Sequence, residues 1–590
     1  MAGAAHIDVL IAGAGPFGLM LACELGRRGI GCLLIDPKTK IADAAQANAT
    51  QARTMEHFRR LGLAAEIRAL GLPPDHPTDI GYFTRFGGHQ LARLPLPTAR
   101  EAAARVKRLG GSWSAAELPH RISQRHVEAT LLRHAQSLPS VQLRLGWALV
   151  DFQDDGDGVL ARVEAQEEAL GQHAPGTHEG TAPPRTASAQ GAAQAQAPLG
   201  VERIRCKYLV GADGARSRVR SALGIRLGGV TGVRRDFMGG QMFAVHLRAP
   251  LLNRTLPHPR CWMNVAVNAQ RRGFMCALDG DAEFVFHAAL LPHEDASGWG
   301  ATEGQRLFDE ALGRHFPVDI LATGTWTAGH SLVATRFRQG RVFLGGDAAH
   351  LFTPAGGLGY NTAVEDAVNL GWKLASVLNG IAPPALLDSY EIERKPLAER
   401  NTTYARRFAD SIGNFKATAL LEEDSAAGAA ARAAATDYLE AHARLEFNIP
   451  GVTFGGRYDA SPLIVKDGST PPPDEANVYV PTASPGGRPP HAWLDGEHSL
   501  FDTFNFEWTL LVLGPAPPDA APFLRHAADM GLDLKRVDHP APSLLELYEA
   551  PLVLIRPDQI VAWRGSSAEV AERVLAQAVG NVSLPDVPTG

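Results

Sequence analysis

Short apolar runs near the N-terminus are separated by a glycine-rich turn and an amphipathic stretch. Residues 6–12 and 31–35 are continuous apolar runs of strand length, and the second leads into Asp36. Such runs are typical of strands buried on both faces of a parallel sheet. Residues 16–28, which open with Pro16 after the glycines, have the spacing of a helix. The pattern predicts a strand, helix, strand unit at the start of the chain.

The rest of the pattern predicts an α/β chain with a β-rich insertion. Residues 236–326 alternate as strands do, with aromatic side chains at intervals. A buried strand at 341–345 then precedes a long predicted helix at 362–378, so the chain returns to its first domain. Strands at 508–513 and 552–555 predict a separate α/β module near the end.

We predict four parts from these patterns and from the Pro/Gly-rich stretch at 471–490. They are a discontinuous α/β domain at 1–80, 111–225 and 331–400, a β-sheet domain at 81–110 and 226–330, a helical segment at 401–455, and a C-terminal α/β domain at 456–590. Residues 166–200 are rich in Ala, Gln, Gly, Pro and Thr. They have too few large apolar side chains to fold alone, which predicts a mobile insertion.

Charge and cysteine content narrow the function. The 590 residues carry 57 basic and 63 acidic side chains, a net charge of −6. No basic field attracts nucleic acid or anionic lipid, so a small-molecule function is favoured. The five cysteines have no CxxC or metal-binding spacing, which predicts reduced core residues, no metal and a cytoplasmic protein. The apolar stretch 9–25 is broken by glycines and Glu24, so we expect neither a signal peptide nor a membrane span.

A glycine-rich turn follows the first predicted strand. Gly13, Gly15 and Gly18, with Pro16 between them, allow a tight turn, close approach of backbone to a pyrophosphate, and a helix N-terminus aimed at negative charge. Asp36 stands 23 residues after Gly13, where a carboxylate accepts hydrogen bonds from a ribose. The turn is typical of a dinucleotide site, and the alternative is a turn that only packs the helix on the strand.

Two acidic turns come directly after buried strands. These are Asp213 with Gly214, and Gly346 with Asp347. Either alone is typical of an ordinary Asx turn, but each carboxylate can accept hydrogen bonds from sugar hydroxyls. Beyond them, the glycine-rich loop 353–359 precedes a helix whose first amides have no intrahelical partner. Such amides suit the negative charge of a reduced flavin, which favours FAD over other dinucleotides.

Together these motifs resemble those of the class A flavoprotein aromatic hydroxylases, which include p-hydroxybenzoate hydroxylase and phenol 2-monooxygenase. The likeness spans about residues 6–410 and includes Tyr-Glu-Ile-Glu-Arg-Lys-Pro at 390–396. Segments 461–464, 485–494, 556–558 and 562–564 resemble the thioredoxin-like C-terminal domain of the phenol 2-monooxygenase and 2,4-dichlorophenol 6-monooxygenase branch. The resemblance implies a Rossmann-like FAD-binding domain with an inserted β-rich substrate domain, followed by a thioredoxin-like α/β domain.

The resemblance also implies a reaction. NADH or NADPH would reduce FAD, O2 would add at flavin C4a, and the hydroperoxide would hydroxylate a phenolic ring ortho to an existing hydroxyl. The residues implied to bind FAD are Gly13, Gly15, Pro16, Gly18, Asp36, Arg53, Gln124, Asp213, Gly214, Gly346, Asp347, Pro354, Gly357, Leu358, Gly359 and Asn361. Of these, Arg53 and Gln124 would reach the pyrophosphate and ribityl region, and the carbonyl of Pro354 would accept the hydroperoxide proton.

Two departures from the family pattern bear on catalysis. Relatives often have Gly-Gln-Gly-Met-Asn where this chain has Gly-Leu-Gly-Tyr-Asn at 357–361, and the phenol of Tyr360 either adds a hydroxyl beside the ring or packs. Phenol hydroxylases have an aspartate at the position of Asn48, and an amide cannot take the proton of a phenol with a pKa of about 10. Asn48 can orient a substrate hydroxyl or carboxylate, while His246, His287 or water would act as the base. For each histidine a packed or surface position is the commoner case.

An aromatic substrate also requires a flat apolar cavity. Phe243, Trp262, Phe284 and Phe286 are candidates to line it, although aromatic residues at strand spacing are more often core. Two alternatives to a phenol hydroxylase stay open: a hydroxylase of larger polycyclic phenols or polyketides, and a non-catalytic flavin-binding interaction protein. The C-terminal domain has no CxxC, which predicts packing or support of a homodimer rather than thiol exchange.

Overall fold

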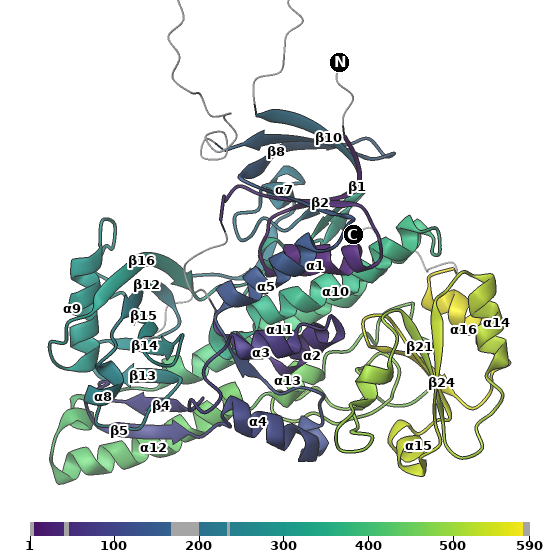
Figure 1. The fold of residues 1–590 in the computed structure, drawn as a ribbon. Helices are drawn as coiled ribbons and strands as arrows, with labels where there is room; N and C mark the ends of the chain where they lie inside the picture. Colours follow the sequence, from purple (N-terminus) through teal and green to yellow (C-terminus); the bar gives the residue numbers. More distant parts are fainter. Residues whose placement is uncertain (1–4, 41–46, 167–199, 233–236, 582–590) are drawn as a thin grey trace, which may run out of the picture.

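Three larger β-sheets organise the part of the chain that the computed structural model describes, residues 5–40, 47–166, 200–232 and 237–581 (Figure 1). The insertion predicted at 166–200 falls almost wholly outside these residues. In Figure 1 the middle sheet and the C-terminal sheet lie on opposite sides of the long helices α10 (Gly359–Leu378) and α11 (Ser389–Asn414). The N-terminal sheet lies above these helices in the same view.

The N-terminal sheet is parallel at its centre and buried on both faces. β1 (Ala5–Ala12) lies between β2 (Cys32–Asp36) and β10 (Val201–Gly211), parallel to both, and β10 is parallel to β19 (Val342–Leu344). The same sheet includes β7 (Val141–Leu145), β8 (Trp147–Asp154), β9 (Val159–Ala165) and β18 (Arg338–Gln339), and α1 (Pro16–Arg27) packs against α5 (Gln124–Gln136) and α10. The predicted strand, helix, strand unit is confirmed.

The middle sheet has two faces with different neighbours. Its order is β16-β12-β15-β14-β13-β4-β5, and its strands are β4 (Ile80–Phe83), β5 (Gln90–Leu94), β12 (Gly240–Arg248), β13 (Met263–Val267), β14 (Arg272–Ala277), β15 (Glu283–Ala289) and β16 (Asp319–Ala328). Because side chains alternate along a strand, Phe274 and Cys276 share one face, here called the inner face. Arg272 on this face donates to the carbonyl of Ile412 on α11. The other face, here called the outer face, packs on α9 (Ala301–Leu312).

The C-terminal sheet is mixed and covered by helices on both faces. Its order is β22-β21-β23-β24, with strands β21 (Trp508–Leu513), β22 (Leu534–His539), β23 (Leu552–Ile555) and β24 (Val561–Gly565). α14 (Ala521–Asp529) and α16 (Ala571–Ala578) pack on the face that carries Leu510, and α15 (Pro542–Tyr548) packs on the face that carries Leu511. The predicted α/β tail is therefore confirmed.

Shorter elements connect the sheets. They are β3 (Ala49–Thr50), β6 (His120–Arg121), β11 (Leu227–Val230), β17 (Ser331–Ala334), β20 (His350–Leu351), α2 (Ala52–Arg60), α3 (Ala64–Ala69), α4 (Ala99–Arg105), α7 (Arg218–Ala222), α8 (Leu252–Thr255), α12 (Ala426–Phe447) and α13 (Pro450–Phe454). All five cysteines are buried thiols. Within the described ranges, no helix combines the length and apolar character needed to cross a bilayer. The four-part domain division remains a prediction, which the separate sheets support.

Buried ion pairs join the C-terminal domain to the helices beneath the N-terminal sheet. Glu393 on α11 accepts hydrogen bonds from Lys373 of α10 at 2.6 Å and from both terminal nitrogens of Arg556 at 2.7 and 2.8 Å. Glu56 on α2 accepts from Arg488 and from Arg53, each at 2.9 Å. We call these two clusters the ionic seam. Every carboxylate in the ionic seam has a cationic partner. The seam therefore fixes the position of the C-terminal domain, here also called the tail, relative to α2, α10 and α11.

The seam predicts a specific acid sensitivity. Burial raises the pKa of Glu56, but Arg488 and Arg53 outweigh burial and lower it to about 2. A carboxyl whose pKa is lowered on folding stabilises the protein fully above its unfolded value of about 4.3, and that stability is lost as the pH falls toward the folded value. At about 1.4 kcal/mol per pH unit, the loss is about 3 kcal/mol. Urea unfolding across this pH range should show the loss of unfolding free energy. Glu56→Gln should flatten the dependence of the unfolding free energy on pH. A pH profile unchanged in that variant contradicts the assignment.

Candidate active site

The three acidic and glycine-rich turns meet at one edge of the N-terminal sheet, here called the cofactor edge because a dinucleotide is expected there. β1, β10 and β19 are neighbours and parallel, so the turns that follow them open at the same end. Gly345 lies so close to Phe17 of α1 that an added Cβ would come 2.0 Å from the ring. This contact brings the turn of Asp347 beside the start of α1.

The glycine turn is close-packed on one side and open on the other. Gly13 has a φ of +121°, and an added Cβ would lie 2.1 Å from the carbonyl oxygen of Ala212. A Cβ on Gly18 would lie 1.9 Å from the oxygen of Gly13. Gly15, in contrast, has no heavy atom within 4 Å of an added Cβ and an ordinary φ of −77°. The open side of Gly15 adjoins the first turn of α1, which begins at Pro16 with no side-chain cap, so its free amides are available to an anion.

Carboxylates line the same edge. Asp36 accepts from the amides of Ala14 at 2.8 Å and Lys38 at 2.9 Å, which holds it against the glycine turn. Asp347 is exposed although residues 342–346 and 348–350 are buried, and it has no hydrogen-bond partner among the described residues. Desolvation by the surrounding protein raises the pKa of Asp347, and His350 offsets part of this. The exposed carboxylate of Asp347 can therefore accept hydrogen bonds from a polyhydroxyl chain.

The segment around Asp347 is held in place by hydrogen bonds to neighbouring helices. His350 contacts the carboxylate of Asp366 through Nε2 at 2.6 Å, and the other oxygen of Asp366 accepts from Arg394 of α11 at 2.7 Å. Arg220 of α7 donates to the carbonyl of Ala348 at 2.9 Å. These contacts hold the turn of Asp347 to α7, α10 and α11.

The loop before α10 is fixed by amide side chains. Gly356 and Gly357 have φ values of +70° and +63°, which require glycine. The Asn361 amide accepts from the Gln51 backbone at 2.9 Å and donates to the Gly357 carbonyl at 2.6 Å. Gln51 in turn donates to the carbonyl of Gly356 at 2.9 Å. Gln51 was not predicted, because nothing in its sequence surroundings indicates a partner 305 residues away.

Three other residues of this loop were predicted to contact FAD. Pro354 is exposed and stands immediately before the turn. Leu358 is buried against the middle-sheet core, and Gly359 begins α10 with no side-chain cap, which leaves its first amides free. Their roles toward FAD stay predictions, and the geometry is compatible with them.

Tyr360 is held by the short strand that precedes α2. Its phenol hydrogen-bonds with the hydroxyl of Thr50, and burial raises the pKa of Tyr360. The side chain is therefore neutral at physiological pH and already has a partner. A packing role fits this geometry better than proton transfer.

We expect Tyr360→Phe to be well tolerated. Loss of one hydrogen bond should lower the free energy of unfolding by about 1 kcal/mol and leave FAD content and turnover nearly unchanged. Denaturation and steady-state assays of the two proteins measure this. A fall in kcat of about 100-fold or more would instead indicate acid or base catalysis by the phenol.

An aromatic cluster covers the inner face of the middle sheet. Phe274 stacks on His287 with ring centroids 4.6 Å apart, and Trp326 donates from Nε1 to Nδ1 of His287 at 3.0 Å. Phe237 contacts Phe274 edge-on. Asn48 hydrogen-bonds with the thiol of Cys276 on this face, and the next residue, Ala49, has its Cβ 3.2 Å from where a Cβ on Gly357 would stand. This face, rather than the outer one, adjoins the loop that precedes α10.

The structure places three of the four predicted aryl-pocket residues on the outer face of the middle sheet. Phe243, Phe284 and Phe286 point to the outer face, where Phe286 packs on Phe308 of α9. All three are at most 1% exposed and serve as core. Their strand spacing was recognised, but alternation alone does not reveal which of two faces adjoins the cofactor. Trp262 does lie toward the N-terminal domain, beneath the guanidinium of Arg121.

Three further predicted residues have hydrogen-bond partners within the protein. Arg53 donates to Glu56 and to the backbone of Asp558 and Gln559 in the C-terminal domain, which places it in the ionic seam. Gln124 begins α5 and donates to Glu128 at 2.7 Å. Asp213, next to Gly214, accepts from the amides of Arg218 and Val219 at the start of α7. Direct contact of Arg53, Gln124 and Asp213 with FAD stays a prediction.

The residues considered for proton transfer occupy different surroundings. Asn48 hydrogen-bonds with the thiol of Cys276 on the inner face. His246 contacts Glu283 at 3.4 Å within a cluster that includes Arg125 and Arg248, which is typical of a structural ion pair. Burial lowers the pKa of His287 to about 4, so its ring is neutral.

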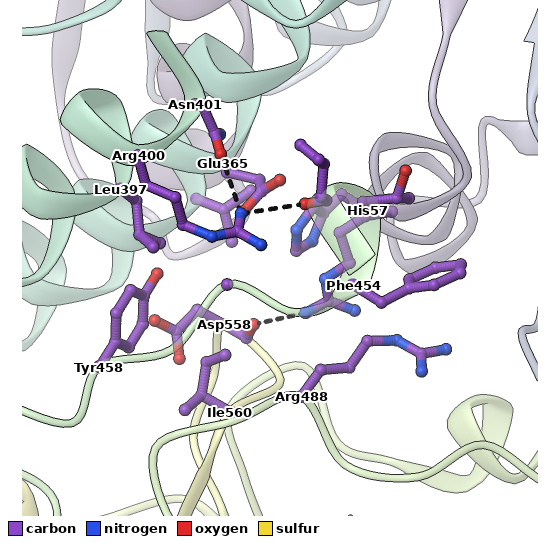
Figure 2. A pocket seen from close by; sticks show the side chains of 15 residues that line it. His57, Glu365, Leu397, Arg400, Asn401, Phe454, Tyr458, Arg488, Asp558 and Ile560 are labelled. Atoms are coloured by element: carbon purple, nitrogen blue, oxygen red, sulfur yellow. Dashed lines mark hydrogen bonds between the residues drawn. The ribbon is translucent and has the colours of Figure 1, made fainter. Parts of the chain in front are cut away.

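A separate cavity lies between the N-terminal and C-terminal domains (Figure 2). Figure 2 shows Arg400, Glu365 and His57 around it, with Asp558 and Arg488 on the side of the tail. Its volume of about 20 Å³ accommodates roughly one water molecule. The cavity is therefore too small and too polar for an aromatic substrate, and it is distinct from the candidate active site.

The open side of Gly15, the unpartnered Asp347 and the uncapped start of α10 fit FAD, and the aromatic inner face beside them fits an aryl ring. Fold and site together define an FAD-dependent aromatic hydroxylase. Residues 6–175 and 177–405 match the family described as FAD binding domain, and residues 482–582 match the aromatic-ring hydroxylase C-terminal family. The chain belongs to the family of FAD-dependent monooxygenases that hydroxylate aromatic rings, for which NAD(P)H is the typical co-substrate.

Relatives support this membership along the whole chain. The phenol 2-monooxygenase of Pseudomonas sp. strain EST1001 is 28% identical over 98% of this chain and 93% of its own length. The tetracenomycin B2 monooxygenase-dioxygenase of Streptomyces olivaceus is 31% identical over 97% of both chains. The structure of the rebeccamycin biosynthetic enzyme RebC with reduced flavin superposes with a TM-score of 0.82 at 30% identity, covering 98% of this chain and 100% of that one.

Proposed function

We propose that the protein hydroxylates a phenolic ring ortho to an existing hydroxyl, with NADH or NADPH and O2 as co-substrates. The observation that carries the proposal is that the inner face, which bears the Phe274–His287 stack, lies beside the loop before α10. Asn48 hydrogen-bonds with Cys276 on that face, and Ala49 next to it lies against Gly357 of the loop. Bound FAD supplies electron transfer from NAD(P)H and activation of O2. The chain itself supplies the cofactor edge, the aromatic side chains of the inner face, and polar groups near that face.

Those polar groups orient rather than deprotonate the substrate. His287 accepts from Trp326 at Nδ1, so the proton of its neutral ring lies on Nε2. The Nε2–H group is therefore a hydrogen-bond donor, suited to a substrate oxygen that bears negative charge. Asn48 can donate or accept, but it cannot take a proton. We infer that the ring hydroxyl is positioned by these two side chains and loses its proton to water.

A hydroxylase of larger polycyclic phenols is the second candidate. The similarity to the tetracenomycin B2 monooxygenase-dioxygenase over nearly the whole chain favours it as much as the similarity to phenol 2-monooxygenase favours the first. Substrate panels that include both monocyclic phenols and anthraquinone-type phenols separate the two.

The test is turnover of the purified holoenzyme. NAD(P)H oxidation is followed with each member of the panel, and products are analysed by mass spectrometry for the gain of one oxygen atom. Stimulated oxidation with an ortho-hydroxylated product supports the proposal. If the yellow protein responds to no member, the non-catalytic flavin-binding alternative gains. Light scattering in the same preparation tests the predicted homodimer.

A further inference from the structure

Arg121 lies on the side of a two-stranded ribbon that faces the loop before α10. In the ribbon of β3 and β6, Arg121 is paired with Ala49. Side chains directly opposite one another in an antiparallel pair project to the same face. The Cβ of Ala49 is 3.2 Å from where a Cβ on Gly357 would stand, so this face adjoins Gly357. Arg121 therefore projects from the ribbon on the cofactor side.

The guanidinium of Arg121 also reaches the middle sheet. Its central carbon lies 3.8 Å from the ring centroid of Trp262, which fixes its plane by a cation–π contact. Cys276 of the inner face lies near enough to interact with it electrostatically, and Asn48 hydrogen-bonds with the same thiol. Arg121, Trp262, Asn48 and Cys276 thus form one corner, here called the Arg121 corner, between the cofactor domain and the inner face.

Arg121 lacks the partner that comparable arginines have. Arg488 is paired with Glu56 and Arg556 with Glu393, both by hydrogen bonds of 2.9 Å or less. In the described parts of the chain, no residue accepts a hydrogen bond from the Arg121 guanidinium or forms an ion pair with it. The indole nitrogen of Trp262 likewise has no acceptor there. The corner therefore presents unused hydrogen-bond donors.

The unpaired cation is costly as it stands. Burial lowers the pKa of Arg121 to about 10, so it stays protonated at neutral pH without a compensating anion. Burial also raises the pKa of Cys276 to about 12, so its neutral thiol is not the counter-ion. A half-buried guanidinium in an apolar corner gains most from a planar oxyanion that binds its fork.

We propose that Arg121 binds an anionic oxygen of the substrate, either an ionised ring hydroxyl or a ring carboxylate, and so selects acidic aromatic substrates over neutral ones. The proposal rests on the proposed function, since it places that substrate on the inner face. The proposal also explains why an amide, Asn48, can stand where phenol hydroxylases have an aspartate. A phenol that binds as its anion needs no protein base. Its proton passes to water, and Arg121 stabilises the charge that remains.

Ligand binding to the oxidised holoenzyme tests the proposal without turnover. Salicylate, 4-nitrophenol and phenol are titrated while the flavin absorbance is followed, with wild type, Arg121→Gln and Arg121→Lys. Arg121→Gln should weaken binding of salicylate or of ionised 4-nitrophenol by about 10- to 100-fold and leave phenol within about threefold. The affinity of Arg121→Lys for these anions should lie between those of the wild type and of Arg121→Gln. The anion that loses more identifies the group that Arg121 binds.

Bound 4-nitrophenol gives a second, spectroscopic readout. In wild type its ionised absorption band should persist at a lower pH than in free solution, and in Arg121→Gln this difference should disappear. Arg100→Gln, which removes an exposed arginine paired with Asp75, is the control and should change neither result. Equal weakening of anions and phenol, or unchanged binding in Arg121→Gln, overturns the proposal. Failure of every phenol to stimulate NAD(P)H oxidation, with anion binding still dependent on Arg121, would instead reject only the hydroxylase function.

Discussion

Gly15→Ala should fold as the wild type does and yet lose FAD. The backbone at Gly15 has a φ that alanine adopts readily, and an added Cβ meets no protein atom within 4 Å. The empty side is the one that adjoins the free amides at the start of α1, where the pyrophosphate of a dinucleotide is expected. A methyl group there would separate those amides from the phosphates. We expect FAD affinity to fall by at least about 100-fold, which is the loss of two charge-assisted hydrogen bonds.

Matched glycine variants separate binding from folding. Gly13→Ala should destabilise the apoprotein itself, because its Cβ would lie 2.1 Å from a backbone oxygen and its φ is positive. Gly110→Ala, at an exposed position with open space around it, should change neither property. Flavin fluorescence titration and thermal unfolding of the apoproteins supply the measurements. If Gly15→Ala retained FAD at wild-type affinity, the cofactor edge would have to be placed elsewhere.

Glu393→Gln should cause the largest loss of stability among single substitutions at the ionic seam. The carboxylate accepts from Lys373, Arg556, Asn369 and Ser461, and all of these donors are buried. Burial raises the pKa of Glu393, but Arg556 and Lys373 outweigh burial and hold it far below its usual range. An amide would leave the buried Lys373 without a counter-charge and Arg556 with Asp558 as its remaining carboxylate. Breaking a buried ion pair in this way costs about 3–5 kcal/mol.

The same helix offers the control. Glu399 of α11 is exposed, so Glu399→Gln should alter stability by less than about 0.5 kcal/mol. Urea unfolding of both variants, together with limited proteolysis between the helices and the tail, distinguishes a loosened C-terminal domain from global unfolding. A loss below about 1 kcal/mol for Glu393→Gln would mean that the seam relaxes or admits water.

The cofactor edge was predictable because its chemistry is local in sequence. Gly13, Gly15 and Asp36 lie within one strand, helix, strand unit, and Asp347 directly follows a buried strand. The inner face was not predictable in the same way. Phe243 and Phe274 have the same strand spacing, and only the packing of α9 on the outer face separates core from candidate pocket.

Other features depend on contacts between distant segments. The partner of Gln51 lies 305 residues away, and Arg53 is engaged by a tail more than 500 residues further along. No sequence pattern marks an arginine that lacks a counter-charge, so Arg121 became a candidate only when its neighbours were known. Patterns predict elements and turns, whereas the pairing of charges depends on tertiary structure.

The ionic seam also limits how such enzymes can exchange parts. Arg53 and Glu56 lie on α2, inside the cofactor domain, yet their partners are in the tail. A chimaera that took its tail from a relative would separate Glu56 from Arg488 and Glu393 from Arg556, and would leave each carboxylate dependent on a partner supplied by the new tail. Productive recombination would have to transfer α2, the start of α11 and the tail as one linked set, so these distant segments are expected to evolve together.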